Sequence, residues 1–241
     1  MNISVVYPAF NEAGNIERTI ARSLDALGGK FDQFELIIVD DGSTDATGAL
    51  AEELARRHPE IVVLHNEHNQ GLAPTLLRGL RWARFELVTY NGMDYPFDLE
   101  DLPKMAALLD HADIVVASRM QHAGYTCYRT IVSYTNRAML RWLFNLPLRD
   151  FNFVQLFRKE VLDAVEVHSR SAGFVAPEII LRAHSQGFRI VSVDIPYYPR
   201  LAGEASCGKP SVVLGSLWEL LSFYWNRRKC APPTGVAGGP S

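Results

Sequence analysis

Cysteine is scarce in this chain, and long apolar runs are missing. The three cysteines, Cys127, Cys207 and Cys230, are odd in number, far apart and without a C-x-x-C or histidine companion, so neither a disulfide framework nor a zinc site is predicted. No apolar stretch reaches the roughly 20 residues that span a bilayer. Met1 leads directly into a strand-like run without a basic leader. We therefore expect a cytoplasmic protein that is at most peripheral at the cytoplasmic membrane face.

Concentrated positive charge and phosphate-binding glycine motifs are also lacking. The 241 residues carry 24 Lys and Arg against 27 Asp and Glu, which gives no electrostatic basis for binding nucleic acid. Neither G-x-G-x-x-G nor G-x-x-x-x-G-K-[ST] occurs, so the dinucleotide fingerprint and the P-loop are both excluded. The 7 histidines fall at no metal-ligand spacing, and we assign them no role.

The chain does contain short β-branched or aromatic runs that alternate with helical periodicity. This alternation is typical of βαβ units on a mainly parallel sheet, and the length suits one large α/β domain. Strands are expected at 3–7, 35–39, 60–65, 85–90, 113–118 and 188–193. Helices are expected at 16–27, 49–54, 72–83, 99–109, 128–144 and 176–184.

Acids, amides and glycines follow each of the first four predicted strands, in the segments YPAFNE, VDDGSTD, HNEHNQG and NGMD. Ligands of parallel α/β sheets gather beyond the carboxyl ends of the strands, so these residues are expected at one edge. A nucleotide could be held there with its base against Pro8 and Phe10, its polar edge at Glu12 and its ribose at Asp40 or Asp41. Taken alone, an Asp-Asp-Gly segment is more often simply a turn.

The order of these motifs resembles family 2 glycosyltransferases with the GT-A fold. The first half carries VVYPAFNEAGNIERTI, IIVDDGSTDAT and NQGLAPTLLRGLRWA. The second half is similar to polyprenyl-phosphate glycosyltransferases of the dolichol-phosphate mannose synthase type, with ASR at 117–119, then Arg129, Ser133 and Asn136, DFNFVQLFRKEVL from Asp150, and RLAGEAS from Arg200. The resemblance covers roughly residues 3–206. It implies a GT-A, Rossmann-like three-layer sandwich with a mainly parallel central sheet.

The same resemblance implies roles for the residues at the strand ends. Pro8, Phe10, Glu12, Asp40 and Asp41 would bind the nucleoside of a UDP- or GDP-sugar. In such a family site the two acids of a D-x-D motif and a nearby Gln hold Mg²⁺ or Mn²⁺.

Here Gly92 replaces the first of those acids and Pro96 replaces the Gln, so that Asp94 alone remains. A hard cation needs oxygen ligands. Metal binding would therefore depend on substitutes such as water, Asn91 or Asp98, and Asp94 is expected to face the diphosphate or the sugar.

The implied reaction is an inverting displacement at the anomeric carbon. A polyprenyl phosphate is already anionic and needs no general base, whereas arginines suit phosphate because their planar fork binds it bidentately. The resemblance places Arg119, Arg129 and Arg200 at the acceptor phosphate or the donor diphosphate. A second departure is Gln155, which stands where the family has Arg or Lys.

Other functions stay open at this point. A soluble acceptor would require a general base, for which Asp94 or Asp98 is the nearest candidate. A degenerate homologue would bind nucleotide without turnover. A receiver-type signalling domain would also place acids after strands, but the chain is too long for one alone, and the motifs of its second half would be unexplained.

The C-terminal region divides into two parts. Residues 212–229 combine aromatic and aliphatic residues with the basic end Arg227-Arg228-Lys229, which suits either the interface of an anionic bilayer or packing against the protein or a second subunit. We expect one domain over 1–229, with a nucleotide-sugar-binding half at 1–118, an acceptor half at 119–210 and an amphipathic helix at 211–229. A Pro/Gly-rich tail at 230–241 is expected to be disordered.

Overall fold

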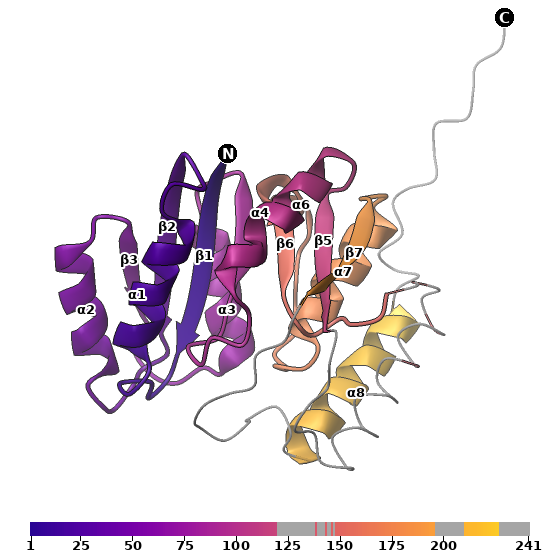
Figure 1. Ribbon diagram of the computed structural model, residues 1–241. Coiled ribbons are helices and arrows are strands. Elements are labelled where there is room, and N and C mark those ends of the chain that lie inside the picture. Colours follow the sequence, from indigo (N-terminus) through magenta and orange to yellow (C-terminus); the bar gives the residue numbers. More distant parts are fainter. Residues whose placement is uncertain (120–137, 139–142, 144–145, 147, 196–209, 227–241) are drawn as a thin grey trace, which may run out of the picture.

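The protein is built around one seven-stranded sheet covered by helices on both faces (Figure 1). The computed structural model describes residues 1–119, 138, 143, 146, 148–195 and 210–226. The strands are β1 Asn2–Ala9, β2 Gln33–Asp40, β3 Ile61–His65, β4 Leu87–Tyr90, β5 Ile114–Arg119, β6 Gln155–Arg158 and β7 Ile190–Ile195. The helices are α1 Ile16–Leu27, α2 Thr47–Arg57, α3 Leu72–Trp82, η1 Leu99–Asp101, α4 Leu102–Ala106, η2 Ala107–Asp110, α6 Lys159–Ala164, α7 Val175–Ser185 and α8 Pro210–Asn226.

The strand order is β3-β2-β1-β4-β6-β5-β7. β3, β2, β1 and β4 are parallel neighbours, β5 and β7 pair in parallel, and only β6 runs antiparallel to both strands that it pairs with. The mainly parallel sheet was predicted, and β1 to β5 and β7 lie within a few residues of their expected positions. β6 was not predicted. It has four residues, and its partners β4 and β5 are distant in sequence, so local periodicity carries little signal for it.

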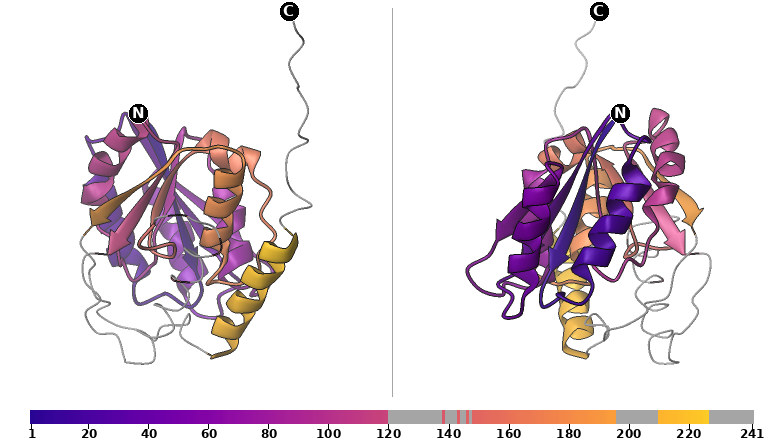
Figure 2. Two further views of the ribbon diagram at one scale, coloured as in Figure 1. Left: turned by 90° about the vertical axis from the view of Figure 1, so that its right-hand side faces the viewer. Right: turned by 60° about the vertical axis from the view of Figure 1, so that its left-hand side comes forward.

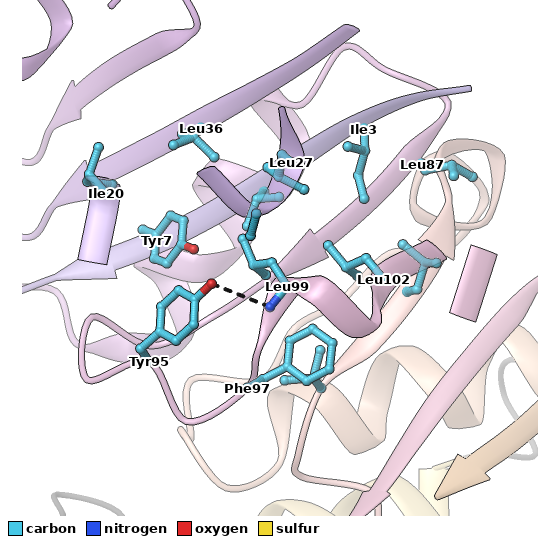
Figure 3. Packing of buried hydrophobic residues seen from close by; sticks show 14 of the residues in the cluster. Ile3, Tyr7, Ile20, Leu27, Leu36, Leu87, Tyr95, Phe97, Leu99 and Leu102 are labelled. Carbon is cyan, nitrogen blue, oxygen red and sulfur yellow. Dashed lines mark hydrogen bonds between the residues drawn. The ribbon is translucent and has the colours of Figure 1, made fainter. Parts of the chain in front are cut away.

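Helices lie on both faces of the sheet (Figure 2), and alternation along the buried strands divides the core into two layers. On β1, Ile3, Val5 and Tyr7 pack with α1, α2 and α4, whereas Val6 packs on the other face with α3, α6 and α7. Figure 3 shows the first layer, in which Tyr7 lies close to Tyr95 on the loop that follows β4. The arrangement is the three-layer sandwich that was predicted.

The helix expected over 99–109 is interrupted. Residues 99–110 instead form η1, α4 and η2 in succession. Pro103, near the start of α4, has no backbone N–H to donate, and Asp98 caps η1 by accepting a hydrogen bond from the backbone N–H of Glu100. Most of the helix expected over 128–144, and all of the tail 230–241, lie outside the described residues.

Helix α8 packs through one face and exposes the other. Leu220 is fully buried, the ring of Phe223 packs edge-on against Phe174, and Glu219 accepts a hydrogen bond from the hydroxyl of Ser169. Residues on the opposite face are well exposed, at 67% for Leu214, 72% for Trp218 and 73% for Trp225. Among the residues that the structure describes, no helix combines the length and apolar character needed to cross a membrane.

Candidate nucleotide-sugar site at the carboxyl edge

The loops after β1, β2, β3 and β4 meet at one edge of the sheet, as the sequence predicted. Backbone hydrogen bonds continue the strand register into these loops. The backbone N–H of Asp41 donates to the carbonyl of Ala9 at 2.8 Å. The backbone N–H of Asn66 donates to the backbone carbonyl of Asp40 at 2.8 Å, and that of Asn91 donates to the carbonyl of Val6 at 3.0 Å. The parallel register therefore brings the predicted nucleoside-binding residues and the Asp94 loop to neighbouring strand ends.

The loop after β1 is tied to the loop after β2. Asn11, with a φ of 55°, donates its backbone N–H to the Ser43 hydroxyl at 3.0 Å. The backbone N–H of Glu12 donates to the Thr47 hydroxyl at 2.8 Å. These bonds fix the backbone that follows Phe10, which is 43% exposed. An exposed aromatic ring on a fixed backbone is suited to packing against a planar base.

Two other residues predicted for this site lie two positions before and after Phe10 in the sequence. Pro8, near the end of β1, and Glu12 are half-buried, and the Glu12 carboxylate accepts a hydrogen bond from the Asn15 side chain at 2.7 Å.

Asp45 belongs to the same pair of loops. Desolvation works to raise the pKa of its carboxyl group, but hydrogen bonds from the Thr47 hydroxyl and from the backbone N–H groups of Thr47 and Ala13 outweigh it and lower the pKa.

Asp40 is buried at the end of β2 and joins three segments. Its Oδ1 accepts the backbone N–H of Ser43 at 3.0 Å, and its Oδ2 lies 3.0 Å from Nδ1 of His65. The other ring nitrogen of His65 lies 3.0 Å from Oε1 of Glu52 on α2. Hydrogen bonding to Glu52, and then to Asp40, raises the pKa of His65 above its usual value. A Cβ on Gly48 would lie 2.8 Å from Oδ2 of Asp40, so this close approach requires glycine.

Asp41 is 3% exposed, and both of its carboxylate oxygens are hydrogen-bonded within the protein. Oδ1 accepts from the Asn66 side chain at 2.7 Å and from the backbone N–H of Gln70 at 2.8 Å. Oδ2 accepts from the backbone N–H of Gly71 at 2.8 Å. Asp41 thus organises the turn between β3 and α3, while its contact with a nucleoside stays a prediction.

Buried and partly buried residues alternate through the loop after β4. Met93, Tyr95 and Phe97 are buried, whereas Gly92, Asp94, Pro96 and Asp98 are only partly so. The Thr19 hydroxyl donates to the carbonyl of Met93 at 2.6 Å, and the guanidinium of Arg22 lies 4.2 Å from the centre of the Tyr95 ring. Burial raises the pKa of Tyr95 to about 12, so its hydroxyl stays protonated at neutral pH. The loop is therefore anchored to α1.

Arg119, at the end of β5, is paired with Asp150. Its Nε lies 2.6 Å from Oδ2 and its Nη2 lies 3.2 Å from Oδ1 of that carboxylate, which is a bidentate contact. The guanidinium also lies 5.4 Å from the centre of the Phe153 ring. Arg129 and Arg200, the other arginines predicted for this site, lie outside the described residues.

A family model decides what kind of protein this is. The model described as "Glycosyl transferase family 2" matches residues 4–165 of the 241. The chain belongs to glycosyl transferase family 2. Among curated relatives, the undecaprenyl-phosphate mannosyltransferase of Micrococcus luteus is 27% identical over 216 residues, covering 85% of this chain and 87% of that protein. The dolichol-phosphate mannosyltransferase of Pyrococcus furiosus is 30% identical over 217 residues, covering 85% of this chain and 59% of that protein.

Solved structures of other glycosyltransferases share the fold. Glucosyl-3-phosphoglycerate synthase from Mycobacterium tuberculosis, crystallised with Mn²⁺, UDP and phosphoglyceric acid, matches with a TM-score of 0.67 and 21% identity, covering 98% of this chain and 81% of that one. Staphylococcus aureus TarS 1–349 with UDP-GlcNAc matches with a TM-score of 0.64 and 21% identity, covering 86% and 60%. The family 2 chain therefore has the predicted GT-A fold.

The residues of this family 2 member do not fit the metal site that the D-x-D motif implies. Asp94 is the one ligand retained from that motif. Asn91 was a possible substitute, but its amide donates to the carbonyl of Phe97 at 2.8 Å and its Oδ1 accepts from the backbone N–H of Gly92. Asp98 was another, but its carboxylate lies 2.5 Å from Nη2 of Arg22. Within the described part of the chain, no three His, Cys, Asp or Glu side chains are grouped so as to hold a metal ion.

Sequence reasoning missed several partners in this family 2 site. Gln155, noted only as a departure, is fully buried, accepts a hydrogen bond from the Tyr90 hydroxyl and donates to the carbonyl of Phe151 at 3.0 Å. His65 was assigned no role, yet it bridges Asp40 and Glu52. The one available signal for His65 was its position at the end of a predicted strand.

Proposed function

We propose that this protein is an inverting glycosyltransferase that moves a sugar from a UDP- or GDP-sugar to a polyprenyl phosphate. The observation that carries the proposal is the agreement among its relatives. Proteins named for sugar transfer to polyprenyl carriers match over most of the chain, including the polyprenol monophosphomannose synthase of Mycolicibacterium smegmatis at 29% identity over 211 residues. The GT-A fold and the shared edge of the first four parallel strands support the same assignment.

The nucleoside would bind over the loops that follow β1 and β2. The exposed ring of Phe10, together with Pro8, would pack against the base, and Glu12 would meet the polar edge of the base. Asp40 and Asp41 would line the ribose side. Because their carboxylates are already hydrogen-bonded, we expect them to act mainly by fixing the backbone around the nucleoside.

In the proposed reaction, an oxygen of the acceptor phosphate attacks the anomeric carbon from the face opposite the leaving group. The bond between that carbon and the β-phosphate oxygen breaks, and the nucleoside diphosphate leaves with the electron pair. No proton has to be removed, because the attacking oxygen is anionic. Arg119, held in one orientation by Asp150, would bind phosphate together with Arg129 and Arg200, and Asp94 would face the sugar or the diphosphate.

The contacts of Asp98, in the loop after β4, favour a lipid phosphate over a neutral hydroxyl as the acceptor. A neutral hydroxyl acceptor would need a general base, for which Asp94 and Asp98 were the candidates. Asp98 is paired with Arg22 and caps η1 by accepting from the backbone N–H of Glu100 at 3.2 Å. Both contacts occupy the Asp98 carboxylate, so taking a proton from an acceptor hydroxyl would require it to leave Arg22 or the start of η1.

Peripheral contact with a membrane would bring the protein to its acceptor. The exposed face of α8 carries Leu214, Trp218 and Trp225, and the sequence continues with Arg227-Arg228-Lys229. Aromatic and basic residues together favour the interface of an anionic bilayer. In every view, α8 lies towards the end of the molecule at which β1 ends (Figures 1 and 2).

The test is a transfer assay with labelled nucleotide-sugars and a polyprenyl phosphate in detergent micelles. We expect label in the lipid phase with one nucleotide-sugar, and a large loss of that label in an Arg119→Met variant. An Arg149→Met variant is a matched control, since Arg149 is exposed and pairs with Asp194 on the surface. Label released only as free sugar would contradict the acceptor assignment. No turnover, with nucleotide binding retained, would favour a degenerate homologue.

A further inference from the structure

The loop that follows β4 contains Gly92 and Pro96, the two residues that interrupt the metal-binding motif. Between Gly92 and Asp98, the alternation of burial leaves Gly92, Asp94, Pro96 and Asp98 partly exposed. Two of these four residues have no side-chain oxygen, and Asp98 is held by Arg22. The carboxylate of Asp94 is therefore the one acidic group of these four positions that a cation could meet without displacing Arg22 from Asp98.

The space of the missing first acid is filled. A Cβ on Gly92 would collide with the carboxylate of Asp94 and would lie 3.3 Å from Cδ of Pro96. Asp94 thus lies back over Gly92, in the place where the side chain of a first acid would begin. The two departures are consistent with each other, because an acid at position 92 would require Asp94 to rotate and would crowd the Pro96 ring.

The loop also has little freedom to bring in other ligands. Tyr95 has a φ of 51°, and its hydroxyl accepts from the backbone N–H of Leu99 at 3.4 Å (Figure 3). Phe97 is fully buried and packs edge-on against Phe153 at 6.1 Å between ring centres. Moving Asn91 towards a cation would break its hydrogen bond to the carbonyl of Phe97.

We propose that this protein binds the diphosphate of its nucleotide-sugar without a divalent metal at the D-x-D position. The inference rests on the proposed function and deepens it. Positive charge for the leaving diphosphate then comes from arginine side chains, which pair bidentately with phosphate and stay charged at all working pH values. Asp94 then contacts the sugar of the donor rather than a metal ion.

The first test is a calorimetric titration of UDP and of GDP into the purified protein, with Mn²⁺ and with EDTA. We expect one nucleotide to bind, with dissociation constants in the two conditions that agree within about twofold, a difference well below 1.4 kcal/mol. A loss of about tenfold or more in EDTA would overturn the proposal. Absence of binding in both conditions would sink the proposed function as well, which separates the two failures.

The second test restores the motif. The backbone of Gly92 is not in the left-handed region, so an L residue can occupy the position if Asp94 rotates. The double variant Gly92→Asp/Pro96→Gln should acquire Mn²⁺ binding, measured by titration of Mn²⁺ alone, and its nucleotide affinity should become EDTA-sensitive. Gly92→Ala/Pro96→Ala is the matched control, because it makes the same backbone changes without adding oxygen ligands. Equal Mn²⁺ binding by the wild type and the restored variant would contradict the inference. The wild-type comparison in the first test stands by itself if the double variant does not fold.

Discussion

Oδ2 of Asp41 lies 2.8 Å from the backbone nitrogen of Gly71, so the residue that follows β2 caps the start of α3. The same carboxylate accepts from Gln70 and Asn66. Asp41→Ala would remove the acceptor of the buried Asn66 amide and of two partly buried backbone N–H groups. We expect the free energy of unfolding to fall by about 3 kcal/mol, since an unsatisfied buried group costs about 1–3 kcal/mol. Asp41→Asn keeps one acceptor oxygen and should cost less. Urea denaturation of both variants measures the difference, and an unchanged stability for Asp41→Ala would show that the three hydrogen bonds contribute nothing.

For Asp41, the sequence predicted the position of the residue in the fold but not its hydrogen-bond partners. Its place at the carboxyl edge follows from a strand of buried residues that ends at Asp40, and such local patterns predicted six of the seven strands. Its partners could not be predicted, because Gln70 and Gly71 are about thirty residues away and meet it only through the parallel crossover. β6 was missed for the same reason. Its place between β4 and β5 depends on pairing that no local pattern records.

His65 should make stability depend on pH. Its pKa in the folded protein is raised above 6.5 by hydrogen bonds to Glu52 and Asp40, so the folded state binds the proton more tightly than the unfolded state does. The stabilisation is fully present below the unfolded pKa and is lost as the pH rises through the raised folded value. Glu52→Gln removes the larger cause and should weaken this dependence. An NMR titration of the His65 ring checks it directly, and a midpoint at or below 6.5 would contradict the bridge.

Asp150 should act as a positioning residue for Arg119. The side chains are 4% and 14% exposed, and removing one partner of a buried pair costs about 3–5 kcal/mol, so Asp150→Asn should be clearly destabilised. If Arg119 binds the acceptor phosphate, the same variant should raise the KM for polyprenyl phosphate more than it lowers kcat. The double variant Arg119→Met/Asp150→Leu should recover stability without activity. Recovery of activity in that variant would exclude a role for Arg119 in binding phosphate.

Two helical glycines offer a matched test of the packing of α3 on the sheet. A Cβ on Gly79 would collide with Cγ1 of Val6 and would lie 3.0 Å from Cγ2 of Val39, whereas a Cβ on Gly215 of α8 meets nothing within 4 Å. Gly79→Ala should lose about 1–3 kcal/mol through overpacking. Gly215→Ala should gain about 0.5–1 kcal/mol, because alanine restricts the unfolded chain and favours helix. Thermal unfolding of both variants gives the answer, and equal shifts would show that α3 does not approach the sheet as closely as the structure indicates.

The exposed face of α8 should determine binding to a lipid surface. Trp218 and Trp225 lie on that face, while Leu220 and Phe223 hold the helix to the body of the protein, so the tryptophans can be changed without undocking the helix. Trp218→Ser should weaken binding to anionic vesicles by about tenfold or more, since burying one large apolar side chain contributes roughly 2 kcal/mol. Trp82→Ser is the matched control, because Trp82 is 58% exposed but lies on α3. Vesicle co-sedimentation measures both variants. Equal weakening by the two variants would mean that apolar surface in general binds the lipid. Unchanged binding by Trp218→Ser would exclude α8 as the lipid-binding surface. The tryptophans of α8 would then be a surface for a second copy of the chain, and analytical ultracentrifugation would detect that dimer.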